Sequence, residues 1–292
     1  MKKELPEISF DSKVDLLIEV MDFAELHHRL QSIKNHDPFS PHQIEFYLIL
    51  VVTKNQYRHF VDFQSHELNA GSTLFIAKNQ VHHFNKELAD AEGFGIVFSH
   101  LFVDQHYFLT DNVRLNRLFN YHIENPVLHR SDLGEDDLIG LFAHLHYEFR
   151  HTNDFAKSEI LASMLRVLLL KAERAKEVRS IGHVNPYWLE TFGAFKDLLE
   201  VEYVNTRSSR KYADKLFVSY KFLNDVVKQL TGKTVKAFID DFVTVEIKRY
   251  LISTALTVNE VAYRTGFEEP PNMIKFFKKN AGMTPLKFRQ QL

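Results

Sequence analysis

The chain has 292 residues, 45% of them hydrophobic and 25% charged, so it is long enough for one large domain or two ordinary ones with a buried core. It contains no cysteine, which excludes a disulfide framework, a thiol nucleophile, an iron–sulfur cluster and a zinc site with cysteine ligands. The net charge of −2 conceals an uneven distribution: residues 1–200 carry 20 Lys/Arg and 29 Asp/Glu, whereas residues 201–292 carry 16 and 9. A basic carboxy-terminal part favours a polyanionic partner.

The amino terminus does not predict export. Charged residues between Glu4 and Asp15 interrupt any signal-peptide apolar region. No segment of the sequence reaches the roughly 18 uncharged apolar residues of a membrane span. We therefore expect a soluble, cytoplasmic protein without membrane contact.

Residues 39–98 have the pattern of an antiparallel β-domain. Short apolar runs at 46–52, 57–63, 73–77 and 94–98 are predicted strands, and the first is apolar enough to be buried on both faces. The residues expected to form turns between them are Asn55, Gly71, Asn79 and Gly93. This spacing is typical of a sandwich or a small barrel.

Residues 136–176 change to a helical period. Apolar residues recur at three- and four-residue steps from Leu138 to Phe149 and again from Ile160 to Leu169. Asp136 and Asp137 fit a helix start, where the helix dipole favours acids. We expect a helical hairpin that covers the β-domain, pairs with a second copy, or does both. Residues 179–186 are a predicted linker.

The carboxy-terminal part contains an internal repeat of about fifty residues. At an offset of fifty, Leu223 matches Met273, Val227 matches Phe277, Lys228 matches Lys278 and Gly232 matches Gly282, while Ala213 matches Ala262 with a one-residue slip. Small alanines suit the close crossing of two short helices in a helix-turn-helix.

The ends of these repeated helices have physical reasons. Ser219 is a predicted amino-terminal cap and Gly232 a predicted left-handed stop, while Pro270 suits the first helical position after the weaker cap Glu269. Between the copies, residues 234–254 predict one helix of 21 residues, roughly 31 Å long at about 1.5 Å per residue. Successive major grooves on one face of DNA lie about 34 Å apart, so the helix would space two reading heads by about one turn. This spacing favours DNA over RNA, whose narrow major groove excludes a helix.

The carboxy-terminal third resembles the arabinose-regulator (AraC/XylS) type of bacterial transcription factor. The motifs that carry the resemblance are Tyr212-Ala213, Val218-Ser219, Thr231-Gly232-Lys233-Thr234, Phe238-Ile239, Leu256 to Ala262, Gly266-Phe267, Phe277-Lys278-Lys279, Gly282-Met283-Thr284-Pro285 and Phe288-Arg289. Segments such as residues 41–47, 61–63 and 79–82 are similar to the cupin-type sensor domain of that family.

The resemblance implies an α+β protein in four parts: a cupin-like antiparallel β-barrel in residues 1–135, a dimerising helical hairpin in 136–178, the linker 179–186, and an all-α DNA-binding domain in 187–292. In that domain two helix-turn-helix units are joined by a long helix. The implied partners are double-stranded DNA, a second copy of the chain, a small-molecule effector and RNA polymerase. No cofactor is implied.

By position, the family's base-reading sites fall at Lys221, Asn224, Asp225, Pro271, Asn272 and Lys275. Asn pairs with adenine, Lys donates to guanine and Asp accepts from cytosine. Candidates for phosphate contacts are Ser219, Lys228, Lys233, Lys236, Lys278 and Lys279. The chain departs from the family at Asp225, which would repel phosphates, at Pro271, which has no donor, and at Val243, where many relatives have arginine.

Histidines are the main candidates for a site in the β-domain. An effector pocket is predicted at His42, Tyr47, His59 and His82. The alternatives are that His42, His59, His82 and His83 bind a metal, or that these histidines have purely structural roles. In the predicted helical region 136–176, His144, Glu148 and His151 have the spacing of one helical face. An ordinary polar face is the favoured interpretation of these residues, so no metal site is predicted.

An enzyme is not expected, because the sequence lacks a Gly-x-Ser-x-Gly elbow, a phosphate-binding glycine loop and a His-Glu-x-x-His helix. The prediction is therefore a sequence-specific transcription regulator that reads two successive major grooves under control of a small effector. The alternative keeps the DNA-binding domain and makes the amino-terminal domain a dimerisation or protein-docking module without a ligand.

Overall fold

A computed structural model describes residues 7–8, 16–34, 36–62, 64–106, 118–119, 125–134, 136–150, 155–179 and 185–290. Two compact units divide the chain, one within Pro6–Ile181 and the other within Gly182–Leu292. The predicted linker residues 180–184 lie outside the described part.

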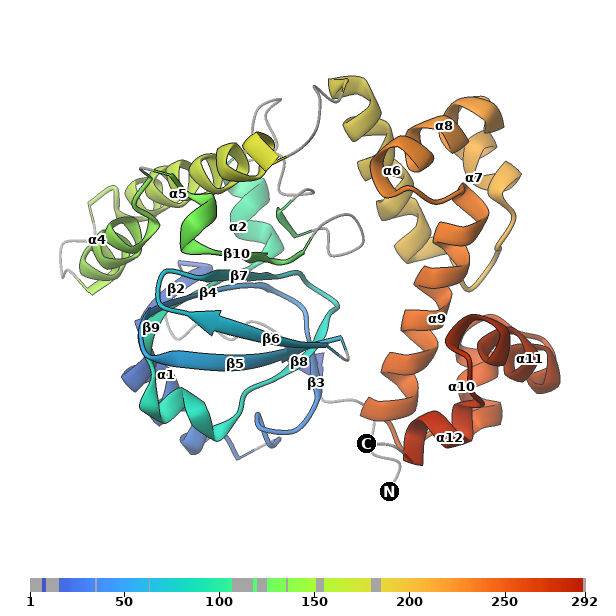
Figure 1. Cartoon of the computed structure of the whole chain (residues 1–292), viewed down its shortest axis with the longest axis horizontal. Helices are drawn as coiled ribbons and strands as arrows, with labels where there is room; N and C mark the ends of the chain where they lie inside the picture. The colour runs from blue at the N-terminus through green and yellow to red at the C-terminus, as the bar shows by residue number, and fades with distance from the viewer. Residues whose placement is uncertain are drawn as a thin grey trace. The chain divides into compact units, whose positions relative to one another are not determined.

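The first unit contains two five-stranded sheets that pack face to face (Figure 1). One has the order β1-β3-β8-β5-β6 and the other β10-β7-β4-β9-β2. Their strands are β1 (Glu7–Ile8), β2 (Ile18–Asp22), β3 (His42–Ile44), β4 (Tyr47–Lys54), β5 (Gln56–Val61), β6 (Gln64–Asn69), β7 (Thr73–Ile76), β8 (Val81–His83), β9 (Glu92–Phe98) and β10 (Val127–Leu128). All described pairings are antiparallel except β1 with β3.

Strand β4 separates two apolar cores. Its even-numbered residues Leu48, Leu50 and Val52 face the core between the sheets, whereas Ile49 and Val51 face a core shared with the helices. The prediction of a strand buried on both faces is confirmed. The alternation follows from the two-residue period of a strand.

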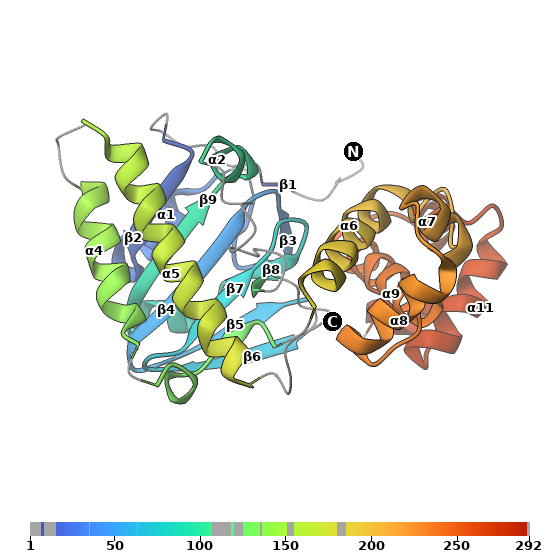
Figure 2. The same cartoon turned by 90° about the horizontal axis from the view of Figure 1, so that it is seen from above.

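Helices cover the second sheet on its outer side (Figures 1 and 2). Contacts join α4 (Leu138–Arg150) to β2, β4 and β9, and α5 (Lys157–Arg179) to β10. The shorter elements of this unit are α1 (Phe23–Ser32), η1 (Lys86–Asp90), α2 (His100–Gln105) and η2 (Arg130–Asp132). The predicted α+β architecture, with a helical pair after the β-domain, is confirmed.

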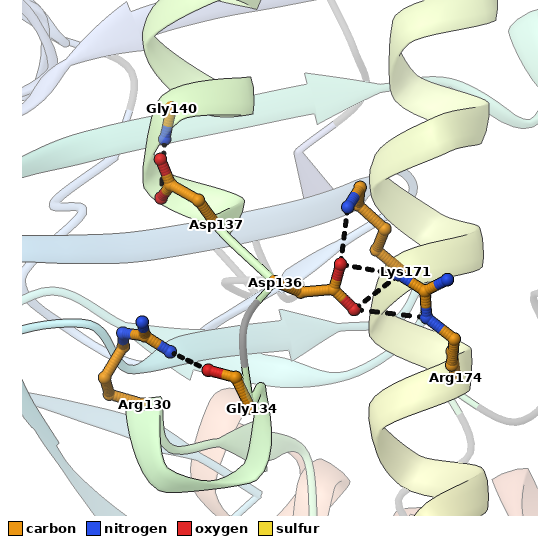
Figure 3. A network of polar contacts seen from close by, with 7 residues as sticks. All are labelled: Arg130, Gly134, Asp136, Asp137, Gly140, Lys171 and Arg174. Atoms are coloured by element: carbon orange, nitrogen blue, oxygen red, sulfur yellow. Dashed lines mark hydrogen bonds and ion pairs between the residues drawn. The ribbon is translucent and has the colours of Figure 1, made fainter.

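Acidic residues fix the start of the helical pair, as predicted. The carboxylate of Asp137 accepts the backbone N–H of Gly140 in the first turn of α4 at 3.0 Å. Asp136 pairs with Lys171 and Arg174 of α5, and Figure 3 shows its carboxylate directed at both. Hydrogen bonds from Arg174 and Lys171 hold the pKa of Asp136 below its ordinary value.

One predicted turn residue was wrong. Asn55, Gly71 and Asn79 do adopt positive φ between strands, but Gly93 lies inside β9. A Cβ at Gly93 would overlap the carbonyl oxygen of Val51 and lie 2.7 Å from the Phe23 ring. Glycine is therefore required there by close packing across the sheet rather than by a turn.

The second unit is entirely helical in its described part. Its helices are α6 (Pro186–Glu202), α7 (Ser209–Lys215), α8 (Tyr220–Thr231), α9 (Val235–Ser253), α10 (Val258–Arg264), α11 (Pro270–Ala281) and α12 (Pro285–Gln290). The long helix α9 passes between α6–α8 on one side and α10–α12 on the other (Figure 1). Its caps are Thr234 and Thr254, so the predicted connecting helix is confirmed.

Candidate nucleic-acid interface

The pairs α7–α8 and α10–α11 are two copies of one helix-turn-helix. The amides of Val218 and Phe267 donate to the carbonyls of Ala213 and Ala262 at 3.1 and 2.9 Å, so the two turns are closed in the same way. Both alanines are buried, as expected for closely crossing helices.

The caps of the second helix in each copy follow the sequence with one difference. Ser219 accepts the N–H of Phe222 at 3.1 Å, and Gly232 ends α8 at a φ of 71°. Gly282 ends α11 at 74°. Glu269 gives α11 no side-chain cap, and Pro270 begins the helix instead.

The outward face of α8 carries a mixed set of polar groups. Lys221, Asp225 and Lys228 are exposed. Asn224 is half-buried, because its Oδ1 accepts the backbone N–H of Val235 at the start of α9. This asparagine therefore holds the turn before α9 in addition to any contact with a base.

The outward face of α11 is more basic. Pro271, Asn272 and Lys275 are exposed at its first turns, and Lys278 and Lys279 at its end. The amide of Asn272 donates to the Glu269 carboxylate at 3.2 Å, a surface contact that a nucleic acid can replace.

Five of the predicted contact lysines form no ion pair within the described residues: Lys221, Lys228, Lys275, Lys278 and Lys279. Lys233 and Lys236 differ, since each pairs with an acid of α9, Asp241 at 2.7 Å and Asp240 respectively. A phosphate contact from either lysine competes with a carboxylate already in place.

Helix α6, the first helix of the second unit, packs against α8. The rings of Tyr187 and Trp188 lie 5.6 and 6.3 Å from the ring of Phe222 in α8. Trp188 is the single tryptophan of the sequence.

In the first unit three of the four predicted pocket residues come together between the sheets. His42, His59 and His82 are buried, the rings of His42 and His82 lie 4.5 Å apart, and Nε2 of His59 is 3.0 Å from Nδ1 of His82. The Tyr57 hydroxyl hydrogen-bonds Nδ1 of His59 at 2.9 Å. Nε2 of His82 is buried without a partner within the described residues.

The three clustered histidines, His42, His59 and His82, are uncharged at pH 7. Burial lowers the pKa of His59 and His82 well below the ordinary value and that of His42 to about 4. The set therefore offers hydrogen-bond donors and acceptors without net charge.

Tyr47 does not belong to this cluster. It stacks on Phe98 at 5.2 Å and meets Phe119 at 4.9 Å in the core under the helices. An odd-numbered residue of β4 faces that side, so the strand period excludes it. Tyr57 takes the place instead; it shares a strand face with His59, because residues two apart on a strand point the same way.

The other metal candidate from the sequence is not supported by a described grouping. His144 is exposed, and His151 lies outside the described residues. Elsewhere Asp22, Glu25 and His146 bring ligand atoms within 4.8 Å of one another. Asp22 and Glu25 form the capping box of α1, and Glu25 also pairs with Arg150, so these groups already have structural partners.

Comparison with protein families assigns the repeated unit. Residues 212–291 match the model of the helix-turn-helix domain family. They form an AraC-type helix-turn-helix domain. A curated relative is the bifunctional transcriptional activator/DNA repair enzyme AdaA of Bacillus subtilis (strain 168), 30% identical over 97 residues, or 32% of this chain. The chain matches 46% of that relative's length, about half.

Solved structures are similar to the AraC-type domain or to more of the chain. The carboxy-terminal domain of the response regulator yesN from Fusobacterium nucleatum is 25% identical over 32% of this chain and 93% of its own, with a TM-score of 0.31. ToxT from Vibrio cholerae O395 is 14% identical over 86% of this chain and 90% of its own, with a TM-score of 0.43. A wild-type ToxT bound to an unsaturated fatty acid is 13% identical over 94% of both chains, with a TM-score of 0.42.

In the AraC-type domain of this chain, the connecting helix α9 has the apolar residue Val243, which is fully buried.

None of the described helices combines the length and apolar character needed to cross a bilayer.

Proposed function

We propose that the chain is a sequence-specific DNA-binding transcription regulator in which α8 and α11 enter successive major grooves. The carrying observation is the duplication: two identically closed helix-turn-helix units expose lysines on their second helices. The 19 residues of α9 give a rise of about 28 Å at about 1.5 Å per residue, close to one turn of DNA.

The proposed base contacts are Lys221, Asn224, Asp225, Asn272 and Lys275. Asn272 is the better candidate for a bidentate contact with adenine, because its amide is exposed and its partner Glu269 is a surface group. Asn224 has its oxygen engaged with Val235, so only its amide N–H groups remain for a base. Ser219, Lys228, Lys278 and Lys279 are proposed phosphate contacts, while Lys233 and Lys236 must first leave their acids.

Gel-shift titration with genomic fragments at two salt concentrations tests the proposal. We expect a few fragments to bind far more tightly than the background, with a log–log salt slope that grows with the number of phosphate contacts. Uniform binding of all fragments would overturn sequence-specific recognition.

For the first unit we propose an effector site at His42, His59 and His82. The supporting observation is the buried Nε2 of His82, since a buried polar atom without a partner costs free energy that a ligand's polar group recovers. The alternative, a docking or dimerisation module without ligand, predicts no stabilisation by any small molecule. Thermal-shift screening of sugars, carboxylates and other small metabolites separates the two.

We also propose that the chain dimerises through its helical pair. Ile160, Val167 and Leu170 are exposed on one side of α5, and Tyr147 of α4 is 66% exposed. Apolar side chains gathered in this way suit a partner surface. A contact with RNA polymerase, a cytoplasmic location and the absence of enzymatic activity stay predictions.

A further inference from the structure

The two turns of the AraC-type domain have the same backbone but different surroundings. Phe217 occupies the turn of the first helix-turn-helix, between α7 and α8, at a φ of 55°, and Gly266 occupies the equivalent turn of the second, between α10 and α11, at 77°. The Phe217 side chain is 95% exposed. A large residue is thus accommodated in this left-handed turn, and the conformation alone does not require glycine.

Gly266 is required by a close contact instead. A Cβ at this position would overlap the carbonyl oxygen of Val204 and lie 2.7 Å from its Cα. At Gly232 and Gly282, which also have positive φ, a Cβ would meet no atom within 4 Å. The loop between α6 and α7 therefore lies directly on the turn of the second helix-turn-helix, between α10 and α11.

Arg207 of the same loop binds this turn from its side chain. Its Nη2 donates to the carbonyl of Gly266 at 2.7 Å, and its guanidinium carbon lies 3.6 Å from the centroid of the Phe267 ring. A planar guanidinium is suited to both contacts at once, because it stacks on an aromatic face while its edge donates hydrogen bonds. Phe267 is itself buried and packs on Phe276 of α11.

The loop also contacts the first helix-turn-helix, through α7, and the connecting helix α9. The Tyr212 hydroxyl of α7 donates to the carbonyl of Thr206 at 2.9 Å. The ring of Tyr203 is buried and lies 5.5 Å from that of Phe242 in the middle of α9. The 203–207 segment thus contacts α7, α9 and the turn before α11.

We propose that the 203–207 segment fixes the separation of the two recognition helices, α8 and α11, with Arg207 as the positioning residue that restricts DNA reading to one spacing between the base sequences that these two helices contact. A long helix is rarely straight on its own, whereas a second connection beside α9 resists relative rotation of the two helix-turn-helix motifs. If α8 and α11 are already held at the right separation, the protein binds DNA with the matching spacing without a further entropic cost of ordering the two helices. It must distort to bind DNA in which the two base sequences have another spacing. The inference rests on the proposed function.

Two measurements test it on the full chain. The first uses the absence of cysteine: Gln229→Cys and Asn259→Cys, both at exposed positions, carry spin labels on α8 and α10 for a distance distribution without DNA. The second selects double-stranded DNA from a random 40-base-pair pool and records the spacing between the two enriched motifs. Both are applied to the parent, Arg207→Ala, Arg207→Lys and Phe217→Ala.

We expect Arg207→Ala to widen the distance distribution at least twofold and to spread the selected spacing over two or more values. Arg207→Lys keeps the charge and one donor but loses the stacked plane, so its width should fall between those of the parent and Arg207→Ala. Phe217→Ala changes the matching, uncovered turn and should leave width and spacing as in the parent.

An unchanged distance distribution in a folded Arg207→Ala protein would overturn the proposal, as would a widened one with a single retained spacing. If the parent protein itself enriches no pair of motifs, the proposed function is wrong. The distance measurement still decides whether the 203–207 segment holds the two helix-turn-helix motifs together. Circular dichroism identifies loss of folding, and in that case Arg207→Lys supplies the comparison.

Discussion

At the scale of single residues, the exposed groups of α11 differ in what they offer to DNA. The amide of Asn272 carries a donor and an acceptor in one plane and can match the edge of one base. The ammonium of Lys279 is a point charge that interacts with any phosphate. In the proposed function these residues, seven positions apart on one helix, have different roles: Asn272 selects a base sequence and Lys279 positions the helix.

Asn272→Ala should relax preference at one base position, with a cost of about 1–3 kcal/mol on the preferred sequence only. Lys279→Ala should weaken all sequences alike and reduce the salt slope by about 1. Competition titrations of each variant with single-base operator variants measure the difference. Equal effects of the two substitutions across all sequences would refute the assignment of roles.

The interior histidines give the first unit a pH dependence of known sign. Their pKa values are lowered by burial, so the unfolded chain, with values near 6.5, binds more protons than the folded one below that pH. The contribution of these histidines to the free energy of unfolding should be fully present above pH 6.5. It should fall as the pH drops towards 4, with a slope of up to about 1.4 kcal/mol per pH unit for each buried histidine.

Urea denaturation between pH 4 and 8 measures this slope, with a probe of β-structure. His59→Gln removes one titrating group and should reduce the slope. The histidine account is wrong if His59→Gln and the parent lose stability with pH in parallel.

At the scale of elements, local chemistry predicted most of the second unit. Ser219, Gly232 and the apolar stripe of α9 act through neighbours in sequence, so their roles are visible in the chain itself. The missed elements depend on distant partners. Strand β6 is polar apart from Leu68 and exists because β5 pairs with it along six residues. Tyr47 and Gly93 were misplaced because strand facing and cross-sheet packing are set only in the assembled sandwich.

The two glycine stops provide a test within the repeat. Gly232→Ala and Gly282→Ala should each destabilise the domain by about 1 kcal/mol, since both positions are left-handed and open, leaving only backbone strain. Thermal unfolding of the two variants should agree closely. Gly232→Asn should lose less, because asparagine tolerates this conformation; a larger loss for asparagine than for alanine would contradict the strain argument.

At the scale of the whole molecule, the basic part of the chain, residues 201–292, lies entirely within the second unit. The basic excess of residues 201–292 includes the five exposed lysines of α8 and α11. Acids remain among them, notably Asp225 and Glu269, so the charge that attracts DNA is moderate. We therefore expect weak non-specific binding and a strong dependence on paired half-sites, for which a dimer raises the effective concentration.

Val167→Glu places a charge in the exposed apolar stripe of α5 and should convert the dimer into a monomer at concentrations where the parent is dimeric. Sedimentation velocity measures the state. Lys86→Glu, a change of charge at an exposed position of η1, is the matched control and should remain dimeric. Binding to a single half-site should be equal in all three proteins, while binding to paired half-sites should fall only for Val167→Glu.

The lone tryptophan gives the molecule an uneven optical signal. Trp188 lies against Phe222 of α8, and α11 contains no tryptophan, so indole emission is expected to respond to changes at α8. Stopped-flow fluorescence with DNA that contains only one of the two enriched base sequences would reveal which recognition helix, α8 or α11, binds first. If α8 and α11 both read DNA, as proposed, the chain carries a natural fluorescent reporter beside one of these two helices.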